Sequence, residues 1–194
     1  MIRKVMKAGR RFWRERRGAA MVEFAFMAPV LALLALGGAE AGRYVLAQQK
    51  VSRMASNISD LTSREPQLSN QDIDQVFDAA EFIMSPFSVG GNTIVIISSV
   101  SKDADGDPVL VNWQRSGAGS MADPSRIGVP GGNATLPNGV DLRAGQDAII
   151  AESFYSYEPL VGSDIFNDTV MYSVAMTAPR FGALTADPID EPTD

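Results

Sequence analysis

Hydrophobic and polar positions divide the chain into segments with different patterns. Residues 19–39 are apolar and contain a single ionisable group, Glu23. A helix rises about 1.5 Å per residue, so this segment would be roughly 31 Å long, close to the hydrocarbon thickness of a bilayer. Pro29 and the Gly37-Gly38 pair would weaken a helix in water, but membrane helices tolerate both. We therefore predict a transmembrane helix over residues 19–39.

The pattern changes after residue 39. Apolar residues then recur at spacings of three and four, which places them on one stripe of a helix. The stripe consists of Tyr44, Ala47, Val51, Met54, Ile58 and Leu61. Polar residues lie between them, so residues 40–62 predict an amphipathic extension of the first helix. We expect the stripe to cover the protein's own core, and a partner helix is the alternative.

A second helix and four strands follow. Ser69 or Asn70 is a suitable N-cap for a helix that ends before Pro86, which predicts a helix over residues 70–84. Its predicted buried face consists of Ile73, Val76, Phe77, Ala80 and Ile83. Alternating and β-branched residues predict strands over residues 93–101, 109–115, 148–157 and 169–177. Helices followed by strands are typical of an α+β fold, in which the helices pack on an antiparallel sheet of about four strands.

The strand patterns also predict which side chains share a face. In the second strand, Val109, Val111 and Trp113 should lie together. In the third strand, two sets of side chains should point to opposite faces, namely Ile149, Ala151, Tyr155 and Tyr157 against Ile150, Glu152 and Phe154. We interpret the aromatic residues as sheet core. Glu152 is either a lone functional acid or, as we expect, part of a solvated strand face.

The remaining segments lack a periodic pattern. Residues 116–145 are rich in Gly, Pro, Asn and Ser, which predicts a long loop that is mobile or faces a partner. It lies within the predicted body, residues 63–186, and residues 187–194 form an acidic tail. Asp103, Asp105 and Asp107 are spaced like the start of a calcium loop, but Asp-Gly between strands is typical of a hairpin turn. We predict the turn and keep these three residues as a weak calcium candidate.

Charge adds an orientation to this picture. Residues 1–17 carry eight basic residues and one acidic residue, whereas the rest of the chain carries nine basic and 22 acidic residues. Under the positive-inside rule, residues 1–17 should face the cytoplasm and the body should lie on the other side of the membrane. Because the basic arm directly precedes a membrane-length apolar run, we do not expect it to bind nucleic acid.

Composition excludes several classes of chemistry. The chain contains no cysteine and no histidine. Thiol nucleophiles, disulfides, Cys/His zinc sites and Ser-His-Asp triads are therefore impossible. No set of residues in the sequence converges on catalysis, so we expect a protein that is not an enzyme and holds no cofactor.

Three hypotheses account for the apolar segment. It is a plain single-span anchor, a secretory signal cut at Ala39-Glu40-Ala41, or a prepilin-type segment whose leader, residues 1–18, is cut on the cytoplasmic side. Gly18 separates the last arginine from the first apolar residue, and Glu23 is the fifth residue counting from Ala19.

The position of Glu23 favours the third hypothesis, the prepilin-type segment. A carboxylate in a bilayer helix costs about 2–3 kcal/mol, which an ordinary anchor has no reason to retain. Cleavage after Gly18 would create a positive amine at Ala19, and Glu23 of a neighbouring helix could pair with it. The alternative is a glutamate that reaches the membrane interface.

Residues 16–31, Arg-Arg-Gly-Ala-Ala-Met-Val-Glu-Phe-Ala-Phe-Met-Ala-Pro-Val-Leu, carry a more specific signal. They resemble the start of TadE-like proteins, the pseudopilins of the tight-adherence (Flp-type) pilus system. Glu40-Ala41-Gly42 fits a later Glu-x-Gly element of that family. Near the C-terminus, residues 152–160 (Glu-Ser-Phe-Tyr-Ser-Tyr-Glu-Pro-Leu) and Pro179-Arg180 are also similar to it.

The resemblance implies a function and partners. It implies a minor pseudopilin of the bacterial inner membrane with a periplasmic body, a pilin-like stalk-and-head arrangement and a role in assembling or initiating a pilus. The expected partners are a dedicated prepilin peptidase that cuts between Gly18 and Ala19, other pilus subunits, which Glu23 would contact, and membrane lipid. An uncleaved, single-span periplasmic binding or scaffold protein is the alternative. A secreted hydrolase lacks candidate catalytic residues.

Overall fold

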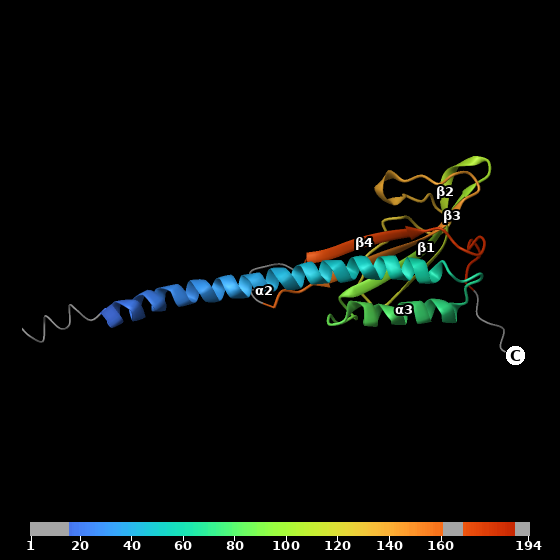
Figure 1. Ribbon diagram of the computed structural model, residues 1–194. Helices are drawn as coiled ribbons and strands as arrows, with labels where there is room; N and C mark the ends of the chain where they lie inside the picture. Colours follow the sequence, from blue (N-terminus) through green and yellow to red (C-terminus); the bar gives the residue numbers. More distant parts are fainter. Residues whose placement is uncertain (1–15, 161–168, 189–194) are drawn as a thin grey trace, which may run out of the picture. The chain divides into compact units, whose positions relative to one another are not determined.

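The computed structural model describes residues 16–160 and 169–188 and has the α+β fold that the sequence predicts (Figure 1). Residues 1–15 of the predicted leader and residues 189–194 of the predicted tail lie outside the described residues. The elements, in order, are α2 (Arg16–Thr62), α3 (Asn70–Met84), β1 (Thr93–Asp103), β2 (Gly106–Gly117), the 3-10 turn η1 (Pro137–Gly139), β3 (Asp147–Tyr157) and β4 (Thr169–Thr177). The chain forms two compact units that divide within α2, between Arg43 and Tyr44.

In the second unit, the C-terminal part of α2 packs on one face of the sheet together with α3. The predicted stripe of α2 is confirmed, because Ala47, Val51, Met54 and Ile58 are buried in the main core and Leu61 packs against it. Tyr44 packs edge-on against Tyr157 of β3, with 5.4 Å between ring centroids. The stripe therefore covers the protein's own core.

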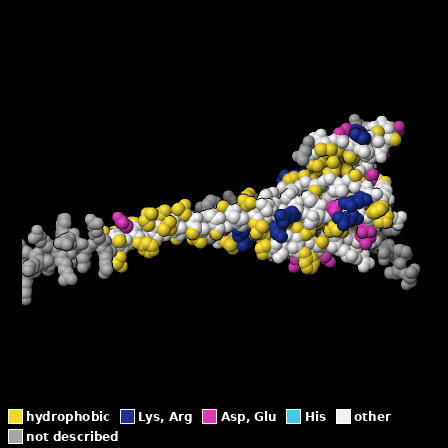
Figure 2. All heavy atoms as spheres, in the orientation of Figure 1, with side chains coloured by type: hydrophobic (Ala, Val, Ile, Leu, Met, Phe, Trp, Pro, Cys, Tyr) yellow, Lys and Arg dark blue, Asp and Glu magenta, His cyan; other side chains and the backbone are white. Residues whose placement is uncertain are grey.

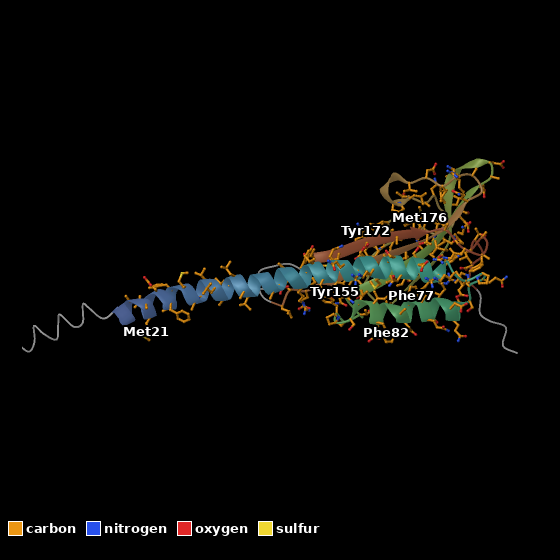
Figure 3. The ribbon with its side chains drawn as sticks, viewed as in Figure 1. Met21, Phe77, Phe82, Tyr155, Tyr172 and Met176 are labelled. Carbon is orange, nitrogen blue, oxygen red and sulfur yellow. The ribbon has the colours of Figure 1, made fainter. Side chains whose placement is uncertain are left out.

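The bounds of α3 follow from local chemistry. Ser69 is the N-cap: its hydroxyl oxygen accepts a hydrogen bond from the backbone N–H of Asp72 (3.1 Å), while the Asp72 carboxylate accepts one from the backbone N–H of Ser69 (2.9 Å). This capping box satisfies two backbone donors that a helix start leaves unpaired. Figure 3 shows Phe77 on the side of α3 toward α2 and the sheet, and Phe82 on the opposite side. A side chain at Gly117 of β2 would collide with the Phe77 ring, since its Cβ would lie 2.3 Å from a ring carbon.

The four strands form one antiparallel sheet in the order β2-β1-β3-β4. The prediction that Val109, Val111 and Trp113 share a face was wrong. The pairing of β1 with β2 shifts between Ser99 and Val100, so that Asn112 is an extra residue in β2. As a result, Trp113 lies in the core beneath the helices, whereas Val109 and Val111 belong to a second cluster on the other face.

The loop between β2 and β3, residues 118–146, covers that second face. Its Ile127 and Leu142 are buried against Val100 and Ile150 of the sheet. Residues 131–134 also run along the outer edge of β2, where Val111 N–H donates to the Gly132 carbonyl (3.0 Å). The composition predicted a loop here, but the loop is attached to the sheet along much of its length.

The segment after β4 closes the main core. Leu184 is buried, and its carbonyl oxygen accepts hydrogen bonds from the Trp113 indole (2.9 Å) and the Ser99 hydroxyl (2.7 Å). Arg180 pairs with Asp60 at the end of α2, and its backbone N–H donates to the Ser63 carbonyl (3.0 Å). Residues 178–184 thus connect the end of α2 to the centre of the sheet.

Candidate functional site

The described part of the first unit, residues 16–43, is an apolar helix whose side chains are almost all exposed among the described residues. Met21, Phe26 and Leu33 each expose 71–76% of their surface, and Figure 2 shows hydrophobic side chains along this part of α2. The described part of the chain has one helix that is long and apolar enough to cross a membrane, and it is this one. Leaving a large apolar side chain in water instead of burying it costs about 1.5–3 kcal/mol. The segment therefore requires lipid or other helices around it.

Gly18, Ala19 and Glu23 lie at the N-terminal end of this helix. All three are exposed, and α2 continues through them from Arg16 without a break. A Cβ built on Gly18 would have no atom within 4 Å, so packing within the chain does not require glycine at this position. Glycine in a helix costs about 0.5–1 kcal/mol relative to alanine, and no packing contact of the described residues offsets that cost at Gly18.

The calcium candidate occupies a hairpin turn. Asp103 ends β1 and pairs with Gly106, the first residue of β2, so that only Ala104 and Asp105 lie between the strands. Gly106 has a φ of +109°, which favours glycine, and this agrees with the predicted Asp-Gly turn. Asp103 and Asp105 are exposed, and the side chain of Asp107 lies outside the described residues. The calcium site remains a prediction.

The expectation that Glu152 lies on a solvated strand face was wrong. The residue is fully buried, and its carboxylate accepts three hydrogen bonds. The donors are the Ser125 hydroxyl, the Arg126 backbone N–H (2.9 Å) and the Tyr172 hydroxyl (3.0 Å). Two of these donors come from the β2–β3 loop, so Glu152 fixes that loop to the sheet.

Aromatic residues complete this cluster. The Arg126 guanidinium lies 4.0 Å from the centroid of the Tyr172 ring and 5.5 Å from that of Phe154. Burial, followed by the negative charge of Glu152, raises the pKa of Tyr172, which therefore stays a hydrogen-bond donor. Both carboxylate oxygens of Glu152 accept hydrogen bonds within the protein, so we assign Glu152 a structural role. The sequence did contain one signal: Glu152 shares its strand face with Ile150 and Phe154, both of which are buried.

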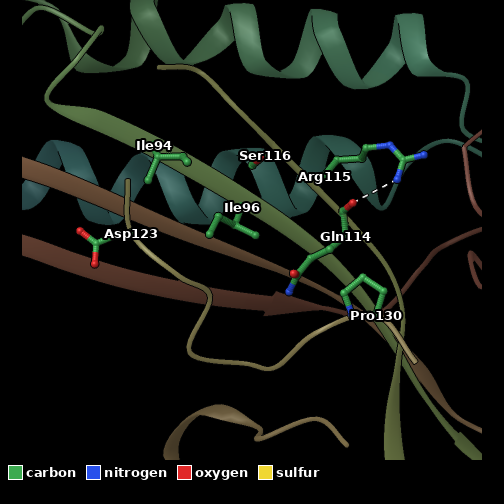
Figure 4. Close-up of a pocket in the computed structure, with 7 residues that line it drawn as sticks. All are labelled: Ile94, Ile96, Gln114, Arg115, Ser116, Asp123 and Pro130. Carbon is green, nitrogen blue, oxygen red and sulfur yellow. Dashed lines mark hydrogen bonds between the residues drawn. The ribbon is translucent and has the colours of Figure 1, made fainter. Parts of the chain in front are cut away.

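A shallow pocket of about 280 Å³ lies beside this cluster (Figure 4). Ile94 and Ile96 of β1 lie side by side in it, with Gln114 of β2 and Asp123 and Pro130 of the loop around them. The Gln114 amide nitrogen, with two hydrogens to donate, lies 2.8–3.1 Å from three oxygens of the protein, so both hydrogens have acceptors within the chain. Among the described residues that line the pocket, the charged ones are Asp123 and Arg115.

The comparisons with known proteins concern the helix. Residues 18–59 match the family model described as TadE-like protein. The chain carries a TadE-like segment. This segment begins at Gly18 and contains Glu23, the apolar helix and Glu40-Ala41-Gly42, as the sequence resemblance predicted. No curated protein and no solved structure matches the chain.

The TadE-like segment includes the one helix of the described residues that is long and apolar enough to cross a membrane. The C-terminal resemblance at residues 152–160 lies outside the matched range. Some of those residues nevertheless have structural roles in the body, since Glu152 holds the loop and Tyr155 and Tyr157 are buried in the core.

Proposed function

We propose that the protein is a minor pseudopilin that supports or initiates assembly of a tight-adherence pilus. A prepilin peptidase would cut between Gly18 and Ala19, on the cytoplasmic side of the bacterial inner membrane, and leave the body in the periplasm. The observation that carries this proposal is the position of Gly18 and Glu23 at one end of an uncovered, membrane-length helix within the TadE-like segment.

The proposed mechanism uses two charges in a low-dielectric environment. Cleavage would give Ala19 a positive α-amine at the start of the helix. Glu23 would lie four residues further along, at about 6 Å of helix rise, and would pair with the amine of a neighbouring subunit. A buried charge that loses its counter-ion is strongly destabilising, so the pair would favour subunits in contact over isolated ones. The apolar side chains of α2 would contact lipid before assembly and other helices after it.

One observation favours the alternative of an uncleaved anchored scaffold protein. The bond between Gly18 and Ala19 lies inside the regular helix that begins at Arg16, so a peptidase would have to open the helix to reach it. In that case the basic arm would remain attached, and the body would act in the periplasm as a binding or scaffold domain.

Replacement of Gly18 by leucine distinguishes these two functions. We expect Gly18→Leu to block cleavage because a bulky side chain prevents close approach to the backbone. An immunoblot of membranes should then show a precursor that is larger by about 2 kDa, the mass of an eighteen-residue leader. Gly37→Leu is the matched control, since a Cβ at Gly37 also has open space and the residue lies far from the junction.

The N-terminal sequence of the membrane-extracted protein completes the test. Ala19 as the first residue supports the pseudopilin, Met1 supports the uncleaved anchor, and Gly42 supports a secretory signal. A mature-size band that persists unchanged in Gly18→Leu contradicts cleavage at this junction.

A further inference from the structure

Phe82 is the most exposed large hydrophobic side chain of the second unit within the described residues, at 81% of its surface. It lies on α3, on the side that faces away from the core, and Figure 3 shows it pointing outward. The inward face of α3 consists of other residues, among them Ile73, Val76, Phe77 and Met84. Phe82 is therefore not part of the face that packs on the core. Among the described residues, little of the chain covers this aromatic side chain.

Acidic side chains surround Phe82 on that outer face. Asp74 and Asp78 lie eight and four residues before it, which places all three on one stripe, and Glu81 is adjacent. Figure 2 shows hydrophobic atoms flanked by acidic ones at the lower margin of the molecule, where α3 lies. Among the described residues, none of these three carboxylates forms an ion pair. The face is therefore an apolar contact point beside unneutralised negative charge.

A stripe of opposite charge lies on α2 of the same chain. Lys50 and the exposed Arg53 follow Leu46 at spacings of four and three, so the three side chains share one side of the helix. Leu46 exposes 40% of its surface. Neither Lys50 nor Arg53 takes part in an ion pair within the part of the chain that the structure describes. This stripe is the complement of the one on α3: an apolar residue followed by two positive charges.

The two stripes also agree in spacing when the helices are antiparallel. Phe82 then lies opposite Leu46, Asp78 opposite Lys50, and Asp74 opposite Arg53. At about 1.5 Å per residue, the three positions span about 12 Å on α3 and about 10.5 Å on α2. The mismatch is about one residue, which long charged side chains accommodate. The arrangement gives one apolar contact and two pairs of opposite charge in a single register.

We propose that the outer face of α3, Asp74–Asp78–Phe82, docks on the Leu46–Lys50–Arg53 stripe of α2 in a second copy of this chain. The contact is heterologous, because each copy uses a different surface on its two sides, and such contacts propagate from copy to copy instead of closing a dimer. A seven-residue connection joins α2 to α3 within one chain, and both pack in one core, so they run antiparallel. An antiparallel contact between α3 and the next α2 therefore makes the α2 helices of successive copies parallel.

Parallel α2 helices suit copies that are anchored in one membrane with the same orientation. The contact is small, and anchoring raises the effective concentration of the copies. Both stripes lie between residues 46 and 82, outside the junction at Gly18. The docking therefore does not depend on cleavage, and its failure would leave the proposed pseudopilin function untouched.

The natural absence of cysteine provides a direct test in the full-length protein in membranes. Two differently tagged chains, one with Phe82→Cys and one with Leu46→Cys, are co-expressed and oxidised. A disulfide requires Cβ atoms about 3.5–4.5 Å apart, so it reports the predicted neighbours. We expect dimers that contain one chain of each kind, no dimers from either variant alone, and a ladder of multimers from a chain that carries both substitutions.

Ser52→Cys serves as the matched control, because Ser52 is exposed on α2 but lies off the stripe. We expect it not to cross-link to Phe82→Cys. Dimers of Phe82→Cys alone would overturn the proposal in favour of a symmetric contact through α3. The absence of cross-links between Phe82→Cys and Leu46→Cys would overturn it as well.

Charge reversal tests the register. Asp78→Lys in the Phe82→Cys chain should lower the yield of mixed dimers by about fivefold, because it places two positive charges opposite each other. Lys50→Asp in the Leu46→Cys chain should do the same, and the two reversals combined should restore the yield. Reversals that leave the yield unchanged, or that fail to restore it together, would overturn the proposed pairing.

Discussion

The two compact units of the chain each contain a glutamate in an apolar setting, and the two glutamates differ in burial. Glu23 of the first unit is exposed on a helix whose apolar side chains are themselves uncovered. Glu152 of the second unit is fully buried and accepts hydrogen bonds from two loop groups and a tyrosine. The carboxylate of Glu152 is hydrogen-bonded inside the second unit, whereas the carboxylate of Glu23 is exposed on the surface of the helix. The described apolar side chains of the first unit are exposed, whereas the buried glutamate of the second unit is hydrogen-bonded within the unit.

The difference predicts that substitutions in the two regions have separate consequences. A change in the first unit should alter assembly and leave the stability of the body unchanged. A change at a buried polar group of the second unit should lower the stability of the body. The substitutions that follow test whether effects on assembly and effects on stability are separate.

The largest effect is expected from Glu23→Ala. The substitution lowers the cost of membrane insertion, so the membranes should contain at least the normal amount of protein. A neighbouring amine would lose its counter-ion, which is strongly destabilising, so we expect pili to decrease by about tenfold or more. Glu23→Asp should be intermediate because its side chain is shorter. The measurement is paired: mature protein in membranes by immunoblot, and pili by electron microscopy.

Normal pili in Glu23→Ala would show that Glu23 is an interfacial carboxylate with no role in subunit contacts. Loss of cleavage with no loss of membrane protein would instead assign Glu23 to recognition by the peptidase. A fall in the melting temperature of the body in Glu23→Ala would show that a change in the first unit also affects the stability of the second.

The next effect is expected from Glu152→Ala. It leaves the Ser125 hydroxyl, the Arg126 N–H and the Tyr172 hydroxyl without their acceptor, so we expect the free energy of unfolding to fall by about 3 kcal/mol. For a body of this size, that corresponds to a drop of roughly 6–12 °C in melting temperature. Calorimetry of the detergent-solubilised protein measures it. Glu152→Gln should lose about half as much, because one oxygen acceptor remains.

Glu158→Ala is the matched control, since Glu158 is an exposed glutamate six residues further along the chain. A surface substitution of this kind typically changes stability by no more than about 0.5 kcal/mol. If Glu152→Ala melted like Glu158→Ala, the loop would not depend on the buried carboxylate.

The smallest effect is expected from Asp141→Asn. The Lys102 ammonium lies 2.9 Å from the Asp141 carboxylate and lowers the pKa of that group below its usual value of 3.8. A lowered pKa means that the pair stabilises the folded body at pH values above the ordinary carboxyl range. The contribution is lost as the pH falls below about 4 and Asp141 becomes protonated. Because Asp141 is exposed, only a slight difference from the wild type is expected at neutral pH.

Melting curves of both proteins from pH 3 to pH 7 test this directly, and the two curves should converge at the acidic end. A difference that grows toward low pH would contradict the assigned cause.

Local signals in the sequence predicted much of this fold. Ser69 and Pro86 bound a helix at residues 70–84, and the structure has the same residues in α3. The alternation of residues 169–177 likewise gives the bounds of β4. Strands β1 and β2 extend beyond the predicted ranges because their end residues pair with each other, up to the two-residue turn before Gly106. This pairing depends on contacts between strands, which the pattern of a single strand does not predict.

The errors came from contacts with irregular segments. The burial of Glu152 depends on Ser125 and Arg126, which lie in a loop without periodicity. The extra residue at Asn112 moves Val111 and Trp113 to opposite faces, and no composition rule marks its position. At the candidate site, Gly18 and Glu23 could be singled out from the sequence because they interrupt an otherwise uniform apolar pattern.

The place of Leu184 has a consequence for the order in which the protein is made. Its carbonyl oxygen accepts from Trp113, 71 residues earlier, and from Ser99, 85 residues earlier. Synthesis is directional, so the apolar helix leaves the ribosome long before this contact is possible. The main core lacks the buried Leu184 side chain until residue 184 has emerged. During that interval the buried Trp113 still lacks its hydrogen-bond partner.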